Sequence, residues 1–261
     1  MKYSEVNEGF AKFAKGFSGF EGGDIGSKTA PSTWVCGIEW GGCEKEENLK
    51  HKFESSDVSN PGTGFNDWRE SIIKPFEYNT MKLLTAIDGE HLKGDEILYK
   101  DFAEKVQPFK REKSRYFKLN LYPLAFKDTG VERWKSCYAE ATGLATKEDY
   151  WDWIKFNRFN IIRSWQEVYA PKLVICFGKS WHVEYSTAFL DEGVSFSNLM
   201  PVQFDGEYQI DGKEMKCHIN TNGTVVVLTP FPSGRHGLVK TTTIRKFGEK
   251  IRKIIHDKKW N

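Results

Sequence analysis

The sequence predicts a layered α/β fold. Strand-like and helix-like segments alternate along its 261 residues, which is the pattern of a sheet covered by helices. Two strand candidates, 172–177 and 224–229, are continuous apolar runs that read KLVICF and TVVVLT. Such runs are typical of parallel strands, because helices bury both of their faces. Hydrophobic residues make up 39% and charged residues 28% of the chain, a balance that argues against disorder.

The expected elements follow from apolar spacing and from helix start and stop signals. Strands are expected at 33–39, 116–122, 172–177 and 224–229. Helices are expected at 66–87, 148–169, 178–190 and 241–256.

Two regions interrupt this alternation. The stretch 43–64 is polar and ends in NPGTG, so we interpret it as an inserted loop, and loops of this length often bind ligands. The stretch 201–219 alternates in places around Asp211-Gly212, a dipeptide that favours a hairpin turn.

Composition excludes several classes of protein. The sequence contains no run of about 18 apolar residues, so it predicts no membrane helix. The first twenty residues lack the layout of a signal peptide. The five cysteines include no C-x-x-C pair, so a zinc ribbon or a cysteine-ligated iron–sulfur cluster lacks its usual signature. We therefore expect a reduced, cytoplasmic protein without metal, cofactor or membrane partner, and a monomer.

The net charge of +2 hides an uneven distribution. Eight basic and two acidic residues occupy positions 240–261, so this tail carries +6 and the rest of the chain carries −4. Apolar residues recur at helical spacing within the tail, which predicts an amphipathic helix with a cationic face. Such a face can bind phosphates, so a small total charge does not exclude a nucleic-acid partner. Thr241, Thr242 or Thr243 is expected to cap this helix.

Polar residues follow the predicted strands where a ligand crevice is expected. In open α/β sheets, ligands bind beyond the carboxyl ends of the strands. Glu39 follows the first strand in GIEWGG, and Asn120 lies in the second in KLNLYP. The third strand runs into GKS, and the fourth runs into PFPSGRHG. Taken singly, Glu39 has an ordinary interpretation as a salt-bridged carboxylate, and Asn120 as a satisfied core amide.

Three common motifs are absent. A phosphate-binding P-loop needs a glycine five residues before Gly178, where the chain has Leu173. Gly37, Gly41 and Gly42 lack the spacing of a dinucleotide-binding motif. The serine of PFPSG lacks the first glycine of a hydrolase nucleophile elbow.

The ordered set of motifs resembles the uracil-DNA glycosylase superfamily. GIEWGG after a strand, the strand KLNLYP, the strand LVICFG before a helix, and LTPFPSGRHG occur in one order over about residues 31–252. The resemblance implies a three-layer α/β/α sandwich around a mainly parallel four-stranded sheet. It also implies that residues 1–261 form one domain of this kind.

The resemblance assigns roles to five residues around the reacting base. Glu39 takes the position of the acid that activates or orients the hydrolytic water. Asn120 takes the position of the asparagine that reads a pyrimidine, since one amide can both donate to and accept from a base edge. Trp40 stands where proline is usual, and Phe231 stands where histidine or asparagine is usual. The expected substrate contacts are therefore Trp40, Phe65, Asn120 and Phe231, and Phe53 is a further candidate for the aromatic that stacks on the base.

The last motif implies a DNA contact. Pro232, Ser233 and Gly234 match the turn that grips phosphates beside the flipped nucleotide, and Arg235 matches the side chain that enters the duplex. His236 is assigned as a second catalytic residue, because Phe231 replaces the histidine that supports the departing base. Arg235 and His236 are also ordinary loop residues in the plainer interpretation.

The leading hypothesis is a DNA glycosylase that excises a flipped, modified or damaged pyrimidine, with DNA as its partner. The departures at Trp40 and Phe231 argue against plain uracil removal, and excision of a modified phage base in bacterial anti-phage defence is one activity that suits them. Two alternatives stay open. One is a catalytically inactive DNA-binding module on the same fold. The other is an unrelated α/β hydrolase in which Glu39 and His236 form an acid–base pair.

Overall fold

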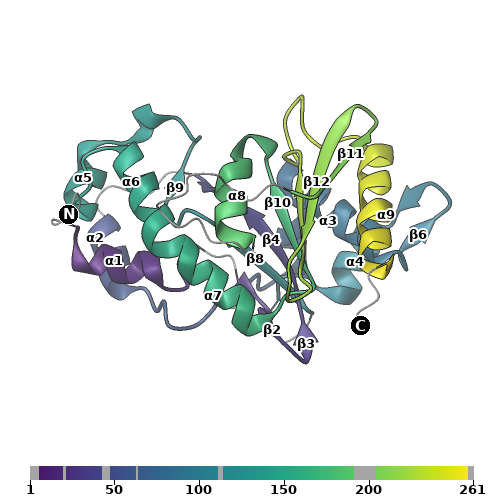
Figure 1. Cartoon of the computed structure of the whole chain (residues 1–261), viewed down its shortest axis with the longest axis horizontal. Coiled ribbons are helices and arrows are strands. Elements are labelled where there is room, and N and C mark those ends of the chain that lie inside the picture. Colours follow the sequence, from purple (N-terminus) through teal and green to yellow (C-terminus); the bar gives the residue numbers. More distant parts are fainter. Residues whose placement is uncertain are drawn as a thin grey trace.

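A seven-stranded mixed sheet forms the centre of the protein (Figure 1). The computed structural model describes residues 6–19, 22–42, 48–62, 64–110, 114–190 and 204–257, and the side chain of Trp40 lies outside this set. The strands lie in the order β1 (Gly22–Gly23), β8 (Tyr116–Asn120), β4 (Thr33–Gly37), β10 (Leu173–Phe177), β13 (Val225–Thr229), β12 (Lys213–Ile219) and β11 (Gly206–Ile210).

The four expected strands are the four central ones, and all of them are parallel: β8 pairs with β4, β4 with β10, and β10 with β13. The expectation of a four-stranded sheet was wrong, because three antiparallel strands extend its edges. β1 is only Gly22–Gly23, which carries no apolar signal. β11 and β12 form the expected hairpin, whose inner strand continues the sheet at β13.

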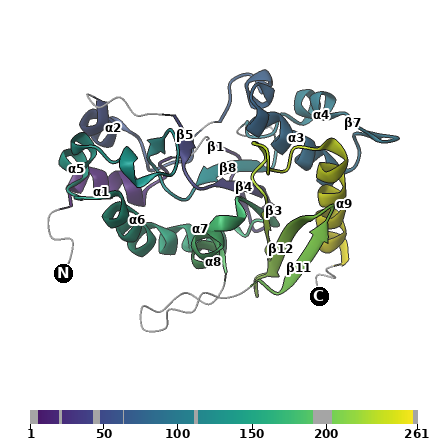
Figure 2. The same ribbon diagram turned by 90° about the horizontal axis from the view of Figure 1, so that it is seen from above.

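Helices cover both faces of the sheet, and successive residues of β4 show this directly. Trp34 and Cys36 belong to one buried core, whereas Val35 belongs to the other. Figure 2 shows α3 and α4 on one side of the strands and α6, α7 and α8 on the other. The first core is covered by α1 (Glu8–Lys15), α2 (Leu49–Ser55), α5 (Ser136–Thr142), α6 (Lys147–Ile154), α7 (Asn160–Tyr169) and α8 (His182–Phe189). The second is covered by α3 (Pro75–Asp88), α4 (Tyr99–Val106) and α9 (Thr241–Asp257).

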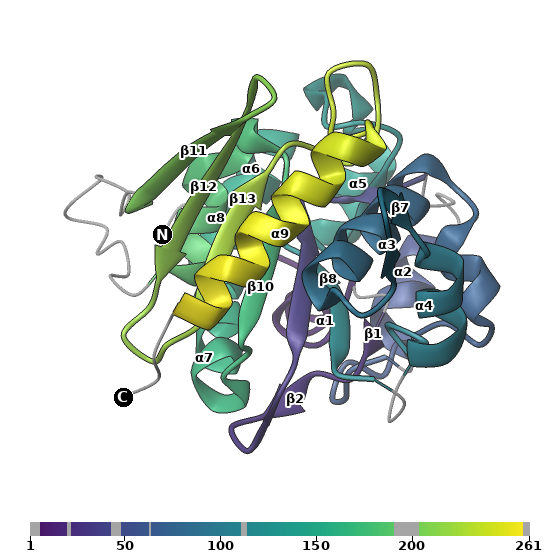
Figure 3. The same cartoon turned by 90° about the vertical axis from the view of Figure 1, so that its right-hand side faces the viewer.

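The C-terminal helix α9 packs against α3 (Figure 3). Gly248 makes the close approach possible, because a Cβ atom there would lie 2.4 Å from the Cβ of Ala86. Ile244, Phe247 and Ile251 point into the core, as the amphipathic pattern predicts.

Smaller elements complete the fold. None of the helices in the described part of the chain is long and apolar enough to cross a membrane. Two-stranded ribbons and short helical turns lie at β2 (Gly26–Ser27) with β3 (Ala30–Pro31), β5 (Trp40–Gly41) with β9 (Ala125–Phe126), β6 (Leu92–Lys93) with β7 (Glu96–Ile97), and the turns Trp68–Ile72, Val131–Arg133 and Lys179–Trp181.

The two interrupting regions have different outcomes. The hairpin turn is confirmed: Asp211 and Gly212 have φ angles of 50° and 72°, as a type I′ turn requires. The interpretation of 43–64 as a loop was wrong in part, because α2 lies within it. Leu49 and Phe53, one helical turn apart, are buried on its inner face. Residues 43–47 and 63 lie outside the described residues.

The stretch expected as one helix at 148–169 is divided. A π-helical turn, Lys155–Phe159, separates α6 from α7, and such turns are often found at functional sites. This turn carries Arg158, whose side chain is fully buried. Its Nε donates to the carbonyl of Leu121 at 2.9 Å, and its other nitrogens donate to Ala14, Gly16 and Ser18. Burial lowers the pKa of Arg158 to about 10.

We predict that Arg158→Met strongly destabilises the protein. The free energy of unfolding should fall by at least about 3 kcal/mol, because several buried carbonyls lose their donor and each costs about 1–3 kcal/mol. Chemical denaturation followed by circular dichroism measures this change. Arg69→Met is the control: its guanidinium is exposed and pairs with Asp67, so its loss should cost less than about 1 kcal/mol. Equal costs for the two variants would contradict the prediction.

Candidate active site

The carboxyl ends of the central strands carry a cleft at the point where the strand order reverses. The chain goes from β4 to β8 on one side and then to β10 on the other, so the switch point lies between β4 and β10. Two adjoining cavities lie at this edge, a larger one of about 960 Å³ and a smaller one of about 290 Å³. Glu39, Gly41 and Phe231 border both of them.

The larger cavity brings together four of the ten site residues that the sequence singled out. Glu39, Phe65, Asn120 and Phe231 all line it, although they come from four separate segments. The backbone of Trp40 lies in β5 beside this edge, but its side chain lies outside the described residues.

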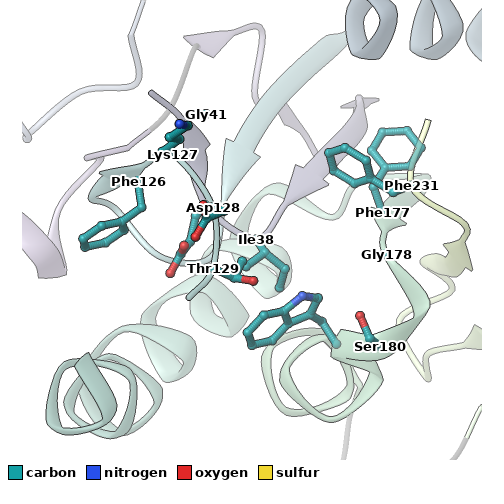
Figure 4. Close-up of a pocket in the computed structure, with 12 residues that line it drawn as sticks. Ile38, Gly41, Phe126, Lys127, Asp128, Thr129, Phe177, Gly178, Ser180 and Phe231 are labelled. Atoms are coloured by element: carbon teal, nitrogen blue, oxygen red, sulfur yellow. The ribbon is translucent and has the colours of Figure 1, made fainter. Parts of the chain in front are cut away.

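The smaller cavity lies beyond the carboxyl ends of β4 and β10. In Figure 4 the rings of Phe177 and Phe231 lie together on one side of it, and Phe126, Asp128 and Thr129 lie on the other. One side comes from the ends of β10 and β13, and the other comes from β9 and the loop after it.

Glu39 is a buried carboxylate that holds two hydrogen bonds. Its side chain is only 4% exposed. The ammonium of Lys147 donates to Oε2 at 3.2 Å, and the indole of Trp151 donates to Oε1 at 3.0 Å. Burial raises the pKa of Glu39 above its ordinary value of 4.5, and the contacts with Trp151 and Lys147 oppose that rise. Each oxygen keeps further lone-pair capacity, since a carboxylate can accept about four hydrogen bonds.

Lys147 and Trp151 were missed by the sequence analysis. They lie one helical turn apart on α6, so both side chains point from the same face toward Glu39. Thr146 caps the helix, its hydroxyl accepting a hydrogen bond from the amide of Asp149 at 3.1 Å. A lysine directly after a cap, four residues before a tryptophan in an aromatic-rich helix, was the available signal.

Asn120 is both a core amide and a cavity residue. It pairs in register with Gly37 on β4, and its Nδ2 donates to the carbonyl of Gly19 at 3.0 Å. That bond fixes the orientation of the amide, because a carbonyl needs a donor opposite it. Gly37 makes room for it: a Cβ atom at 37 would lie 2.4 Å from the Oδ1 of Asn120.

Aromatic rings, one buried cation and two glutamates, Glu70 and Glu77, line much of the rest of the larger cavity. The ring centroids of Phe76 and Phe231 are 5.2 Å apart. The ammonium of Lys118 lies 5.1 Å from the ring centroid of Phe76 and 5.5 Å from that of Phe65, within the range of cation–π attraction. Lys118 is two residues before Asn120 on β8, so both point to the same face. Neither Lys118 nor Phe76 was singled out from the sequence, although a lysine within an apolar strand was a usable signal.

The expected DNA-gripping turn is compact. Asn79 donates to the carbonyl of Pro232 at 2.9 Å, and the amide of Leu238 donates to Phe231 at 2.8 Å. Within it Gly234 and Arg235 are exposed and Ser233 is half-buried.

His236 does not join the site. Its side chain is exposed, it lines neither of the two cavities, and its carbonyl accepts a hydrogen bond from Lys213 at 2.9 Å. The two cavities therefore give no support to the expected catalytic role of His236, which stays a prediction.

Part of the positive charge of α9 is paired locally. Lys246 contacts Asp211 at 2.6 Å and Arg245 contacts Asp95 at 3.6 Å, and both of these carboxylates lie outside the tail. At the start of the helix, the hydroxyl of Thr241 accepts a hydrogen bond from Lys82 at 3.2 Å. The charge surplus of the tail therefore overstates the charge that this helix presents to a partner.

Comparisons with known proteins give no identity. No protein-family model matches the chain, and no curated protein matches it. Within the described residues, no group of three or more His, Cys, Asp or Glu side chains is arranged to hold a metal ion.

We predict that Gly37→Ala disturbs the cleft while Gly41→Ala does not. The new methyl group at 37 collides with the Asn120 amide, which should cost about 1–3 kcal/mol of unfolding free energy. At Gly41 no described atom lies within 4 Å of the new Cβ, so the cost should stay within about 0.5 kcal/mol. Urea denaturation of both variants checks this. A Gly37→Ala protein as stable as wild type would show that the amide moves freely.

Proposed function

We propose that this protein is a DNA glycosylase that hydrolyses the N-glycosidic bond of a flipped, modified or damaged pyrimidine. One observation carries the proposal: the larger cavity is lined together by Glu39, Asn120, Phe65 and Phe231. These are residues to which the resemblance to the uracil-DNA glycosylase superfamily assigns the chemistry and the grip on the base.

Glu39 supplies the chemistry in this proposal. Cleavage of a glycosidic bond passes through a sugar with oxocarbenium character, so positive charge develops next to the carboxylate. A largely buried carboxylate stabilises that charge and can accept a proton from the attacking water. Glu39 must be ionised for either task, and Lys147 and Trp151 both favour that form.

The remaining residues hold the base. A base that leaves the stack is kept in a pocket by ring contacts and by hydrogen bonds to its edge, which offsets the few kcal/mol of unstacking. Phe65 and Phe76 offer ring faces, and Asn120 offers an oriented amide. Lys118 adds a donor between the two rings. The volume of about 960 Å³ leaves room for a substituent on the base.

One observation favours the alternative of an inactive DNA-binding module. Both oxygens of Glu39 already accept hydrogen bonds from the protein, as in a structural ion pair. In that case DNA binds through the turn at Ser233–Arg235 and no bond is broken.

We predict that the wild-type protein forms abasic sites in at least one member of a panel of oligonucleotides. The panel carries uracil, 5-hydroxymethyluracil, 5-hydroxymethylcytosine or a glucosylated pyrimidine, each in single and double strands, and alkali cleavage reveals the product. Glu39→Gln should lower the rate by about 10²–10⁴-fold, because it removes the group that accepts the proton.

Glu184→Gln is the matched control. Glu184 is also a largely buried carboxylate paired with a lysine, Lys155 at 3.1 Å, but it borders neither cavity. Its activity should equal that of the wild type. If the wild type forms no product on any substrate, but binds DNA in a way that salt and Arg235→Ala weaken, the inactive binding module replaces the glycosylase.

A further inference from the structure

Lys147 is a fully buried cation that pairs with Glu39, the carboxylate that borders both cavities. Its side chain is 0% exposed, and its ammonium donates to Glu39 and to the carbonyls of Asp128 and Gly130, each of the latter at 3.4 Å. It also lies 3.8 Å from the ring centroid of Phe126. These contacts come from two segments of the chain, one at Glu39 and the other at residues 126–130.

Stability alone is a weak reason for this arrangement. Taking an ammonium out of water costs several kcal/mol, and apolar residues of similar volume often replace buried ion pairs without loss. The contacts instead have a clear geometric consequence. One ammonium binds both the carboxylate that borders the two cavities and the loop whose residues 127–129 line the smaller cavity.

We propose that Lys147 is a positioning residue that holds the Glu39 carboxylate between the two cavities and couples it to the loop at 128–130. This inference rests on the proposed function, because it concerns the carboxylate that acts there. Lys147 itself is buried and does not touch the substrate. With Lys147 on Oε2 and Trp151 on Oε1, the carboxylate keeps one orientation, and its remaining lone pairs are available to water.

Other charges face this pair and are part of its environment. Asp128 and Glu132 both lie near Lys147 and favour its charged form. The negative charge of Asp128 also raises the pKa of Glu39. Asp128 is itself held by Arg133 at 2.7 Å. Burial lowers the pKa of Lys147, whereas the Glu39 carboxylate opposes that change. The charge of Lys147 in turn favours the ionised form of Glu39.

The experiment compares Lys147→Met and Lys147→Arg with the wild type. Lys147→Met should lower the rate of abasic-site formation by about 10²-fold, the cost of a reacting group displaced by about 1 Å. The acid limb of its profile of rate against pH should move to higher pH, since loss of the cation makes Glu39 harder to ionise. Lys147→Arg keeps the charge and should restore part of the rate and the original limb. Lys147→Gln, which keeps a donor without the charge, replaces the methionine variant if that variant does not fold.

A second readout needs no activity. The indole N–H signal of Trp151, assigned among the nine tryptophans by Trp151→Phe, reports the state of the carboxylate that it contacts. Its pH midpoint in a proton–nitrogen NMR spectrum should rise in Lys147→Met. Lys155→Met is the matched control, because Lys155 pairs with Glu184 outside both cavities, and it should leave the rate and the midpoint unchanged.

The two proposals fail in different ways. A wild type that releases no base, together with a shifted Trp151 midpoint in Lys147→Met, removes the glycosylase function and retains the positioning role. An active wild type whose pH profile and Trp151 midpoint are the same in Lys147→Met overturns the positioning role and retains the function.

Discussion

The buried guanidinium of Arg158 is the constraint on which the cleft depends. It joins the chain after α1, the carbonyl of Leu121 after β8, and the π-helical turn between α6 and α7. A fully buried guanidinium must satisfy its donors within the protein, so these three segments are fixed relative to one another. The chain that Arg158 holds at Ser18 leads directly to Gly19, whose carbonyl orients Asn120. A residue that borders neither cavity thereby sets the geometry of the amide that lines the larger one.

The same continuous helical region supplies a second buried cation. Lys147 from α6 fixes the position of Glu39, as Arg158 fixes the chain before β1. Both cations donate to loop carbonyls and to a group just after a strand. Lys118 places a third cation between aromatic rings in the larger cavity. A cleft built in this way has its charges fixed before any ligand arrives, which lowers the cost of ordering it on binding. That property suits the proposed glycosylase, which would have to discriminate among similar bases.

The sheet topology explains why polar residues so far apart in sequence share one cavity. Because β8, β4, β10 and β13 are parallel, their carboxyl ends meet at one edge, and the order reverses between β4 and β10. The positions of Glu39 and Asn120 at this edge both follow from this rule. His236 lies only five residues beyond Phe231, yet the compact turn directs it to the surface. Proximity in sequence to a strand end is therefore a good guide for the first residues after the strand and a poor one beyond a turn.

The sequence by itself determined the central parallel strands, the hairpin at Asp211-Gly212 and helix α9. Each of these is specified by a local pattern: an apolar run, a turn dipeptide or a helical repeat. Only the tertiary structure decided the antiparallel edges, the break of the long helix at the π-helical turn, and the partners of Glu39. A glycine pair such as Gly22–Gly23 becomes a strand only when a neighbour supplies its hydrogen bonds. Likewise, a buried lysine such as Lys147 is explained only by acceptors about 20 and 110 residues away in the chain, and no local pattern encodes contacts at that separation.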